Sequence, residues 1–347
     1  MSDLVGIDIG RNTIKLVSLS KTGEVLSLDS LGEIKAPVME IKNDEDRSKF
    51  LVDAEVVIKS LLDDLKIKPK QVVASLPENE VISRLVRLPP LKESEIMDAL
   101  KFEAETFVPY ALDEVSIDYE IVEKDDAGRL TIFVVAARNK LIQSYIKLFK
   151  SLGLELLALE SPSVALRRIV KTNINTVERL VIVDLGEVFS DIFNMNKGNI
   201  YFARSILVGG ESITRAISLG LSLDMASAEE YKKAYGIKET ELEGKIRAAV
   251  MPVFSNIAEE IRKAIALFVE DSGGKKVELL VLSGGGANLP GMAEELTKIL
   301  GVEVQVMQPL SKIDTTKIKT QFNLNVDGCR FGLAVGLAMR GLMGNEH

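Results

Sequence analysis

The sequence has a single cysteine, Cys329, a single histidine, His347, and no tryptophan among its 347 residues. One cysteine cannot form an internal disulfide, so the composition suits a reducing compartment. A Cys/His zinc site and a histidine-based catalytic triad both need more of these residues than the chain contains. The composition therefore excludes these two kinds of site.

A concentration of positive charge and a long apolar run are also missing. The formal net charge is -8, and lysines and arginines are interleaved with acidic residues, so we expect no nucleic-acid partner. The longest uncharged run, Leu279 to Ala293, is broken by glycine and proline and is shorter than the roughly 20 residues of a membrane-spanning helix. Met1 to Leu4 do not resemble the start of a secretory signal. We expect a cytoplasmic protein without direct membrane insertion, held at a membrane only through a protein partner.

The length and the apolar content of 46% are sufficient for two lobes with separate cores. Short apolar runs at Leu4–Ile9, Ile14–Leu19 and Val25–Leu31 predict an antiparallel meander. A helix capped by Asn43 or Asp44 and running to Leu65 follows, and then a strand over Gln71–Leu76.

A second block of elements has its own alternating and helical faces. It comprises a strand over Val81–Leu88, a helix over Glu93–Phe107, a hairpin near Asp125–Gly128 and a helix over Asn139–Leu152. We interpret this block as a small inserted subdomain.

The chain then repeats its opening pattern. Ile7-Asp8-Ile9-Gly10, followed by an apolar run, is echoed by Val183-Asp184-Leu185-Gly186 at the end of a strand over Leu180–Leu185. Two strand-turn-strand copies of similar length, one opening each half, predict a duplicated α/β domain.

Each copy places an aspartate at a strand end beside a glycine, Gly10 or Gly186, that lets backbone N–H groups point outward toward phosphate oxygens. In the first turn, Arg11 is also assigned to the nucleotide, Asn12 and Thr13 add side-chain donors, and Lys15 supplies a point charge suited to a β- or γ-phosphate.

The two aspartates of these copies are the expected metal ligands. Asp8 and Asp184 would face each other across a cleft and hold a hydrated Mg²⁺, which prefers one or two carboxylates plus water and phosphate. Without a metal the paired carboxylates would repel each other.

A glycine triplet forms a third element. The strand Leu280–Ser283 is followed by Gly284, Gly285, Gly286 and Asn288, with a helix expected near Pro290. The triplet allows close approach of the backbone to a base, ribose or phosphate, and the alternative is a flexible connection.

The order of these motifs resembles that of the actin, sugar-kinase and heat-shock chaperone superfamily. Gly209, Gly210 and Glu211 resemble the turn and helix after its second phosphate hairpin, and Gly328–Met343 resembles its connecting helix. Glu229 and Lys232 resemble the pair that contacts the ribose and adenine, the alternative being an exposed helical ion pair.

The resemblance implies an α/β, actin-like two-lobe ATPase fold of duplicated ribonuclease-H-like domains with an inserted α+β, SHS2-like subdomain. We expect residues 1–84 and 160–178, with a connecting helix over 328–344, to form the first lobe and residues 85–159 the insert. Residues 179–223 and 277–327 would form the second lobe, and residues 224–276 its helical subdomain.

Residues of the inserted subdomain indicate which family of this superfamily the chain resembles. Leu88–Ile96, Phe102–Pro109, Val134–Arg138 and Ser151–Pro162 resemble the PilM family, the cytoplasmic actin-like proteins of type IV pilus assembly, which is related to the cell-division protein FtsA and to GspL of type II secretion. The C-terminal residues do not resemble the amphipathic tail of FtsA, which favours PilM.

The PilM resemblance implies that the protein binds ATP and captures the N-terminal peptide of a PilN-like bitopic membrane protein, in a groove between the first lobe and the insert. It further implies a place in the inner-membrane alignment complex, near the pilus motor ATPases. The groove residues are not identified by the sequence.

One departure concerns turnover. Hydrolysing relatives usually carry a second glycine after the second Asp-apolar-Gly, whereas Glu187 and Val188 follow Gly186 here and would crowd a γ-phosphate. We expect weak or no ATPase activity and assign no catalytic residue. The alternative is that Glu187 orients water as a base, a role for which the sequence has no matching motif. The alternatives are an FtsA-like filament protein and a small-molecule kinase of the same fold.

Overall fold

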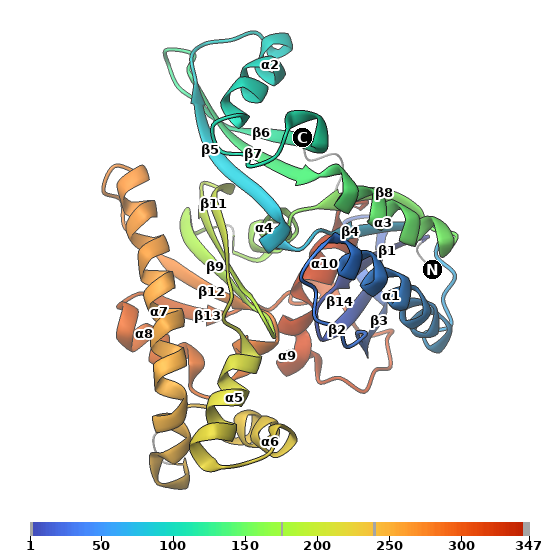
Figure 1. The fold of residues 1–347 in the computed structure, drawn as a ribbon, viewed down its shortest axis with the longest axis vertical. Coiled ribbons are helices and arrows are strands. Elements are labelled where there is room, and N and C mark those ends of the chain that lie inside the picture. The colour runs from blue at the N-terminus through green and yellow to red at the C-terminus, as the bar shows by residue number, and fades with distance from the viewer. Residues whose placement is uncertain (1–2, 175, 239–240, 343–347) are drawn as a thin grey trace.

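Two mixed sheets that share the same order of five strands form the two lobes of the computed structural model, which describes residues 3–174, 176–238 and 241–342 (Figure 1). Each sheet contains an antiparallel three-stranded meander. The first strand of this meander also pairs, along its other edge, with a parallel strand. The first sheet has the order β14-β3-β2-β1-β4-β8 and the second β11-β10-β9-β12-β13. The predicted duplication of an α/β domain is confirmed.

The strands of the first lobe are β1 (Leu4–Ile9), β2 (Thr13–Thr22), β3 (Val25–Lys35), β4 (Gln71–Ser75), β8 (Glu155–Glu160) and β14 (Ile313–Asp314). Those of the second lobe are β9 (Arg179–Leu185), β10 (Ser190–Asn196), β11 (Asn199–Ile206), β12 (Leu279–Ser283) and β13 (Glu303–Val306).

Two central helices, α4 (Pro162–Asn173) and α10 (Gly332–Met339), lie between the sheets. Every residue of α10 is buried, as expected for a helix that is apolar all round. A Cβ atom on Gly336 would lie 2.2 Å from the carbonyl oxygen of Ala165, and one on Gly6 would lie 2.4 Å from that of Ala334. The backbones therefore meet directly, and only glycine fits at these two positions.

Outer helices cover the far face of each sheet. The first sheet carries α1 (Asp44–Asp64) and α3 (Asn139–Ser151), and the second carries α5 (Gly210–Leu221), α7 (Lys245–Asp271) and α8 (Met292–Leu300). Helix α6 (Met225–Tyr235) packs on α5 and α7. The Asn43 side chain accepts a hydrogen bond from the Asp46 amide, so the predicted cap of α1 is confirmed. None of the helices in the described ranges has both the length and the apolar character of a membrane span.

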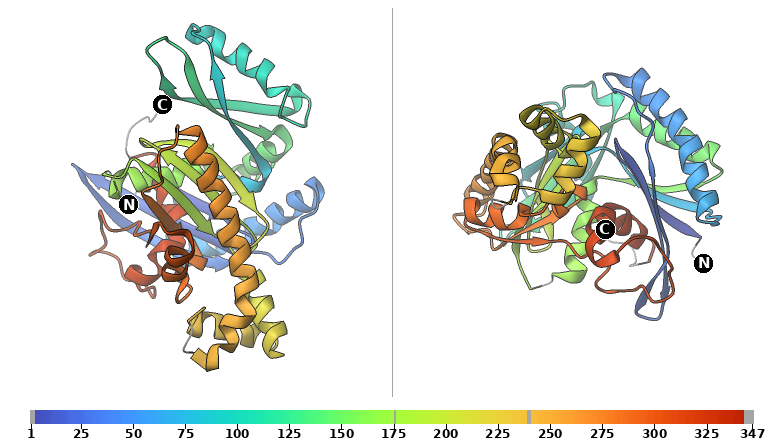
Figure 2. Two further views of the ribbon diagram at one scale, coloured as in Figure 1. Left: turned by 90° about the vertical axis from the view of Figure 1, so that its left-hand side faces the viewer. Right: turned by 90° about the horizontal axis from the view of Figure 1, so that it is seen from below.

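The inserted subdomain is a three-stranded sheet of order β5-β7-β6, and it projects from one end of the two lobes (Figure 2). It consists of β5 (Val81–Leu88), α2 (Glu93–Ala104), β6 (Val115–Lys124) and β7 (Leu130–Arg138). The short elements elsewhere are η1 (Glu78–Glu80), η2 (Leu112–Glu114), η3 (Glu241–Gly244), η4 (Gly285–Asn288), α9 (Leu324–Asp327) and η5 (Gly328–Phe331).

The structure differs from the expected boundaries in three places. Helix α3, expected in the insert, packs on α1 because its apolar face, including Tyr145 and Phe149, completes the outer core of the first lobe, and β8 then extends that lobe's sheet. Strand β14, expected in the second lobe, pairs with β3. The helix expected over 328–344 is divided into η5 and α10, and residues 343–344 lie outside the described residues.

The insert also contacts the second lobe. Asn199 of β11 donates to the carbonyl of Val122 at 2.8 Å, and the Tyr201 hydroxyl donates to Glu123 at 3.2 Å. Arg167 of α4 pairs with Glu120 at 2.6 Å. The Val122 and Phe133 side chains belong to the same apolar core as the central helices. Three parts of the molecule therefore share one core.

We predict that Gly336→Ala destabilises the protein by about 1–3 kcal/mol, the usual cost of overpacking a core, because the new methyl group collides with the Ala165 carbonyl. Gly328→Ala is the matched control, since its Cβ would meet its nearest neighbour at 3.9 Å. Thermal unfolding of both variants checks this, and equal midpoints would contradict the packing argument.

Candidate functional site

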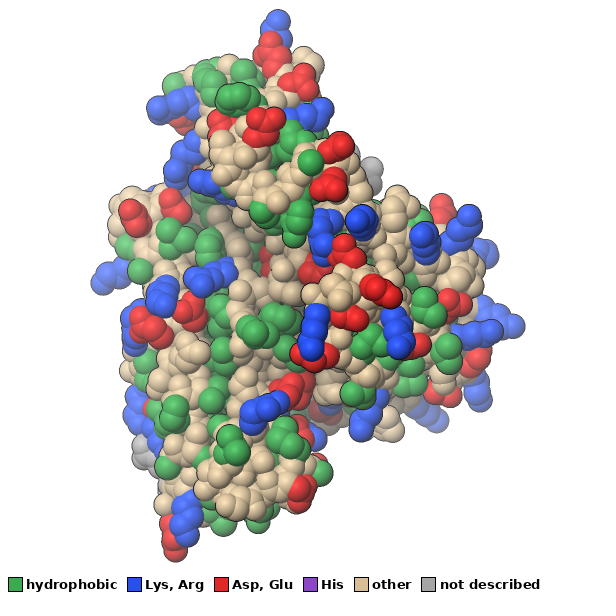
Figure 3. All heavy atoms as spheres, in the orientation of Figure 1, with side chains coloured by type: hydrophobic (Ala, Val, Ile, Leu, Met, Phe, Trp, Pro, Cys, Tyr) green, Lys and Arg blue, Asp and Glu red, His purple; other side chains and the backbone are tan. Residues whose placement is uncertain are grey.

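A cleft of about 580 Å³ lies between the two lobes, and both contribute to its lining. Figure 3 shows acidic side chains between the lobes, with lysine and arginine side chains on the surface to either side. Most of the site residues expected from the sequence line this cleft: Asp8, Gly10, Arg11, Asn12, Thr13, Lys15, Asp184, Gly186, Gly210, Glu229, Lys232, Gly284, Gly285, Gly286 and Asn288.

Gly209 and Glu211 are not among the lining residues. Gly209 is the N-cap of α5, and a Cβ there would lie 2.5 Å from the Glu187 carbonyl oxygen, so this glycine lets the helix approach the second turn. Glu211 instead pairs with Arg215 on the same helix at 2.7 Å. Gly209 therefore contributes to the site by allowing α5 to pack closely against the second turn, and not by lining the cleft.

The two turns have the same backbone geometry. The Gly10 amide donates to the Thr13 carbonyl at 3.1 Å, and the Gly186 amide donates to the Phe189 carbonyl at 3.0 Å. A Cβ on either glycine would lie 2.7 or 2.8 Å from that carbonyl oxygen. Both glycines are thus required by the turn itself.

The strands that flank these turns carry different charges. Asp8 lies opposite Lys15, whose Nζ is 3.5 Å from the Asp8 carboxylate, whereas Asp184 lies opposite a second aspartate, Asp191. Asp191 also lines the cleft and was not predicted. It stands seven residues after Asp184, as Lys15 stands seven after Asp8, so alignment of the repeat was the available clue.

The floor of the cleft disfavours ionised carboxylates. Burial, together with the charge of Asp8, raises the pKa of Asp184 to about 6. Burial and the charge of Glu78 raise the pKa of Asp191 well above its usual value. Burial likewise raises the pKa of Glu78 to about 7, although a hydrogen bond from Ser161 opposes the shift. Glu78 also lines the cleft. It follows β4 outside any recognisable motif, and the sequence did not predict it as a site residue.

The far end of the cleft contains the pair expected to contact the ribose and adenine. Lys232 Nζ lies 2.6 Å from Glu229, and it also donates to the Gly210 carbonyl at 3.1 Å. Thr214 donates to Glu229 at 2.6 Å. Burial raises the pKa of Glu229, but the bonds from Lys232 and Thr214 outweigh it and leave this pKa below the usual value. Glu229 and Lys232 therefore form part of the wall of the cleft, and they are not an ion pair on the exposed surface of a helix.

The glycine triplet, Gly284 to Gly286, forms another wall of the cleft. A Cβ on Gly284, which has φ of +81°, would lie 2.6 Å from the Leu185 carbonyl oxygen, and one on Gly286 would lie 2.8 Å from the Leu185 Cβ. A Cβ on Gly285 meets no described atom within 4 Å. Asn288 donates to the Val326 carbonyl at 2.8 Å, which fixes its side chain. Gly285 is thus the triplet residue with open space around it.

Glu187 lies beside the start of α5. A Cβ on Gly210 would be 3.2 Å from the Glu187 carboxylate and 3.2 Å from Lys232 Nζ. Burial raises the pKa of Glu187, and Lys232 opposes the shift. Its carboxyl group therefore occupies the place beside the start of α5 where a helix N-terminus would otherwise attract an anion.

The first turn fits an anionic ligand. Arg11 donates from Nη2 to the Met39 carbonyl at 3.1 Å, while its buried Nη1 has no hydrogen-bond partner among the described residues. Burial, followed by the charge of Arg47, lowers the pKa of Arg11. Arg11 and Lys15 both line the cleft, and cationic donors of this kind form strong hydrogen bonds to phosphate oxygens.

The metal ligands expected from the sequence fit a hydrated ion. Within the described ranges, no group of three histidine, cysteine or acidic residues is arranged to hold a metal ion. Asp8 and Asp184 alone match the one or two carboxylates by which Mg²⁺ is commonly held together with water and phosphate.

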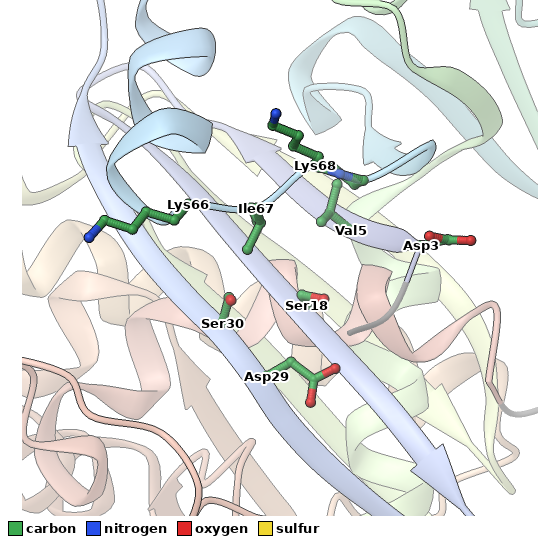
Figure 4. Close-up of a pocket in the computed structure, with 9 residues that line it drawn as sticks. Asp3, Val5, Ser18, Asp29, Ser30, Lys66, Ile67 and Lys68 are labelled. Atoms are coloured by element: carbon green, nitrogen blue, oxygen red, sulfur yellow. The ribbon is translucent and has the colours of Figure 1, made fainter.

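A second cavity, of about 280 Å³, lies beside β1, β2 and the loop after α1 (Figure 4). Its Lys66 and Lys68 side chains point in different directions and do not converge. Asp29, also in its lining, accepts a hydrogen bond from Ser20 at 2.8 Å. We assign no ligand to this cavity.

The family of the chain follows from a comparison with family models. The model for the type IV pilus assembly protein PilM matches residues 6–342. The chain belongs to the PilM family. Cell division protein FtsA of Staphylococcus epidermidis is 23% identical over 330 residues, which cover 86% of this chain and 63% of that protein. This PilM-family chain therefore spans less than two thirds of the length of the curated relatives that it matches.

Solved structures show the same fold. A PilM–PilN type IV pilus biogenesis complex matches with a TM-score of 0.84 and 24% identity over 98% of both chains. The ethanolamine utilization protein EutJ of Carboxydothermus hydrogenoformans has a TM-score of 0.58 and 17% identity over 96% of this chain and 88% of its own. MreB5 of Spiroplasma citri bound to AMPPNP has a TM-score of 0.55 and 14% identity over 98% of this chain and 96% of its own.

We predict that Glu78→Gln stabilises the protein at high pH. The Glu78 carboxyl ionises near 4.5 when unfolded and near 7 when folded, so folding takes up protons and the free energy of unfolding falls as pH rises between these values. The amide avoids this loss, and the variant should exceed wild type by on the order of 3 kcal/mol at pH 8. Near pH 4.5 the difference should be small. Thermal unfolding at both pH values checks this, and a pH-independent difference would contradict the assigned pKa.

Proposed function

We propose that the protein binds ATP with Mg²⁺ in the cleft between its lobes. The observation that carries the proposal is the pair of matched Asp-apolar-Gly turns that line one cleft, with Arg11 and Lys15 beside the first turn. Asp8 and Asp184 would hold the Mg²⁺, whose charge would offset that of the phosphates. The Glu229–Lys232 pair and Gly284 to Gly286 would contact the nucleoside. The AMPPNP bound by MreB5, a protein of the same fold, supports this choice of ligand.

Turnover is slow or negligible in this proposal. Glu187 places a carboxylate beside the first residue of α5, where it would repel a phosphate group. Val188 follows Glu187 in the same turn and adds a branched side chain to the lining of the cleft. The ATP would then act mainly as a structural ligand of the two lobes.

We propose a scaffold role in type IV pilus assembly. The protein would be cytoplasmic and peripheral at the inner membrane, held there by the N-terminal peptide of a PilN-like membrane protein, and it would stand near the pilus motor ATPases. Membership of the PilM family and the likeness to the PilM–PilN complex over 98% of both chains support this role.

The junction between the insert and the first lobe is the proposed peptide site. There the Tyr110 ring centre lies 5.5 Å from the guanidinium carbon of Arg138, which pairs with Asp44 of α1 at 2.5 Å. Tyr110 is 41% exposed. Tyrosine and arginine are enriched among the few residues that carry most of the energy of a binding interface.

We predict that Lys15→Ala weakens ATP binding by tenfold or more, because it removes a charge-assisted hydrogen bond to phosphate, worth roughly 1.5–3 kcal/mol. Isothermal titration calorimetry with ATP and Mg²⁺ measures it. Lys68→Ala, a lysine outside the cleft, should keep wild-type affinity. Unchanged affinity of Lys15→Ala would refute the assigned phosphate site.

We predict that Tyr110→Ala weakens binding of the PilN-like N-terminal peptide by roughly tenfold or more, as expected when an aromatic anchor is removed. Fluorescence anisotropy with a labelled peptide measures this affinity. Leu219→Ala, which removes an exposed apolar side chain from α5, should bind as wild type does. Equal affinities of the two variants would place the peptide elsewhere.

A further inference from the structure

Glu78 is a buried acidic residue in the lining of the cleft between the lobes, and the proposed ATP site leaves it without a role. It is the first residue of η1, which leads from β4 of the first lobe to β5 of the insert. Its exposed fraction is 4%. A carboxylate in such a place needs a cation or several hydrogen-bond donors, because water no longer solvates its charge.

The hydrogen bonds of Glu78 do not meet this need. In the part of the chain that the structure describes, the Ser161 hydroxyl, at 3.1 Å, is the hydrogen-bond partner of its side chain. That hydroxyl is shared, since it also lies 2.6 Å from Ser163 Oγ and accepts from the Ser163 amide at 3.3 Å. One shared hydroxyl does not compensate for the burial of a negative charge.

The charged groups nearest to Glu78 do not supply a cation either. Asp191 of β10 is a second buried carboxyl group, and the charge of Glu78 contributes to its raised pKa. On η1 itself, the Glu80 carboxylate binds both Arg47 and Arg138. These two arginines are therefore engaged by the other acidic residue of the same short helix.

The remaining elements around η1 are β5, β11 and α4, and their arginines also have other partners. Arg84 lies over the Phe107 ring, Arg87 pairs with Asp271, Arg204 with Glu260, Arg167 with Glu120 and Arg168 with Glu160. Glu78 therefore retains its proton until the pH reaches about 7, which is the pKa that burial gives it.

A protonated carboxyl group differs from an ionised one in what it can bind. It has an O–H donor, whereas a carboxylate only accepts hydrogen bonds. Phosphate oxygens are acceptors, and their negative charge strengthens the bond. Glu78 shares the lining of the cleft with Asp8 and Asp184, the proposed metal ligands, beside which the phosphates would lie.

We propose, on the basis of the ATP site proposed above, that Glu78 donates a hydrogen bond to a phosphate oxygen of the nucleotide as a neutral carboxylic acid, so that binding takes up a proton. The bound phosphate favours the protonated form of Glu78, and the ionised form repels the phosphate. Affinity for ATP is consequently highest below about pH 7 and falls as the pH rises through this value.

The test is isothermal titration calorimetry of the full chain with ATP and Mg²⁺ at pH 7.0 and pH 8.5. If the phosphate raises the pKa of Glu78 by about one unit, wild type should bind roughly fourfold more weakly at the higher pH. Titrations at pH 7.5 in buffers of different ionisation enthalpy measure proton uptake, which should be about half a proton per ATP bound.

Two variants separate the donor from the charge. Glu78→Gln keeps an N–H donor and cannot ionise, so it should bind within about twofold of wild type at pH 7.0, lose the fourfold pH effect and take up about half a proton less. Glu78→Ala has neither charge nor donor and should bind roughly tenfold more weakly than Glu78→Gln. Glu259→Gln, on the exposed face of α7, should behave as wild type does.

Three outcomes count against the proposal in different ways. An equal pH dependence in wild type and Glu78→Gln would assign the titration to other groups of the cleft, and equal affinities of Glu78→Gln and Glu78→Ala would refute the role as a donor. ATP binding without any pH dependence would overturn the role of Glu78 and leave the ATP site intact. No binding of ATP by wild type at either pH would refute the ATP site itself.

Discussion

The direct backbone contact between the two central helices and their neighbours sets the geometry of the whole molecule. Gly336 lies against the Ala165 carbonyl and Gly6 against that of Ala334, so α10 is clamped to both α4 and β1. Arg168 reinforces this contact, because it binds Glu160 at 2.9 Å and the Gly336 carbonyl at 2.5 Å within the core. This close approach brings the ends of β1 and β9 together. The charge of Asp8 consequently contributes to the raised pKa of Asp184.

The duplication explains both the similarity and the imbalance of the two halves of the cleft. Backbone geometry is preserved, since each turn has the same glycine and the same amide-to-carbonyl hydrogen bond. Side-chain chemistry has diverged, since the first hairpin has Lys15 where the second has Asp191. The cleft is therefore cationic at its first turn and acidic at its floor, which suits the bridging of a polyanion by metal ions.

The repeat, the glycine triplet and the helix faces could be predicted from the sequence because each depends on local residue order. Asn43 caps its helix through a neighbour three residues away, and Gly10 is required by a contact within its own turn. The environments of Glu78 and Asp191 could not be predicted, because they arise from burial between segments distant in the chain. The boundary of the insert was misplaced for the same reason: α3 follows β7 directly, but its apolar face fits α1.

The attachment of the insert to both lobes has a thermodynamic consequence. Covalent connections join it to the first lobe, while Asn199, Tyr201 and the shared apolar core join β6 to the second. Any rotation of the lobes must carry the insert along or break these contacts. Ligands at the cleft and at the insert junction would then be linked by one coupling free energy, and linkage makes it reciprocal: each would alter the affinity of the other by the same factor. A membrane-anchored peptide would in that case regulate nucleotide occupancy as strongly as the nucleotide regulates the peptide.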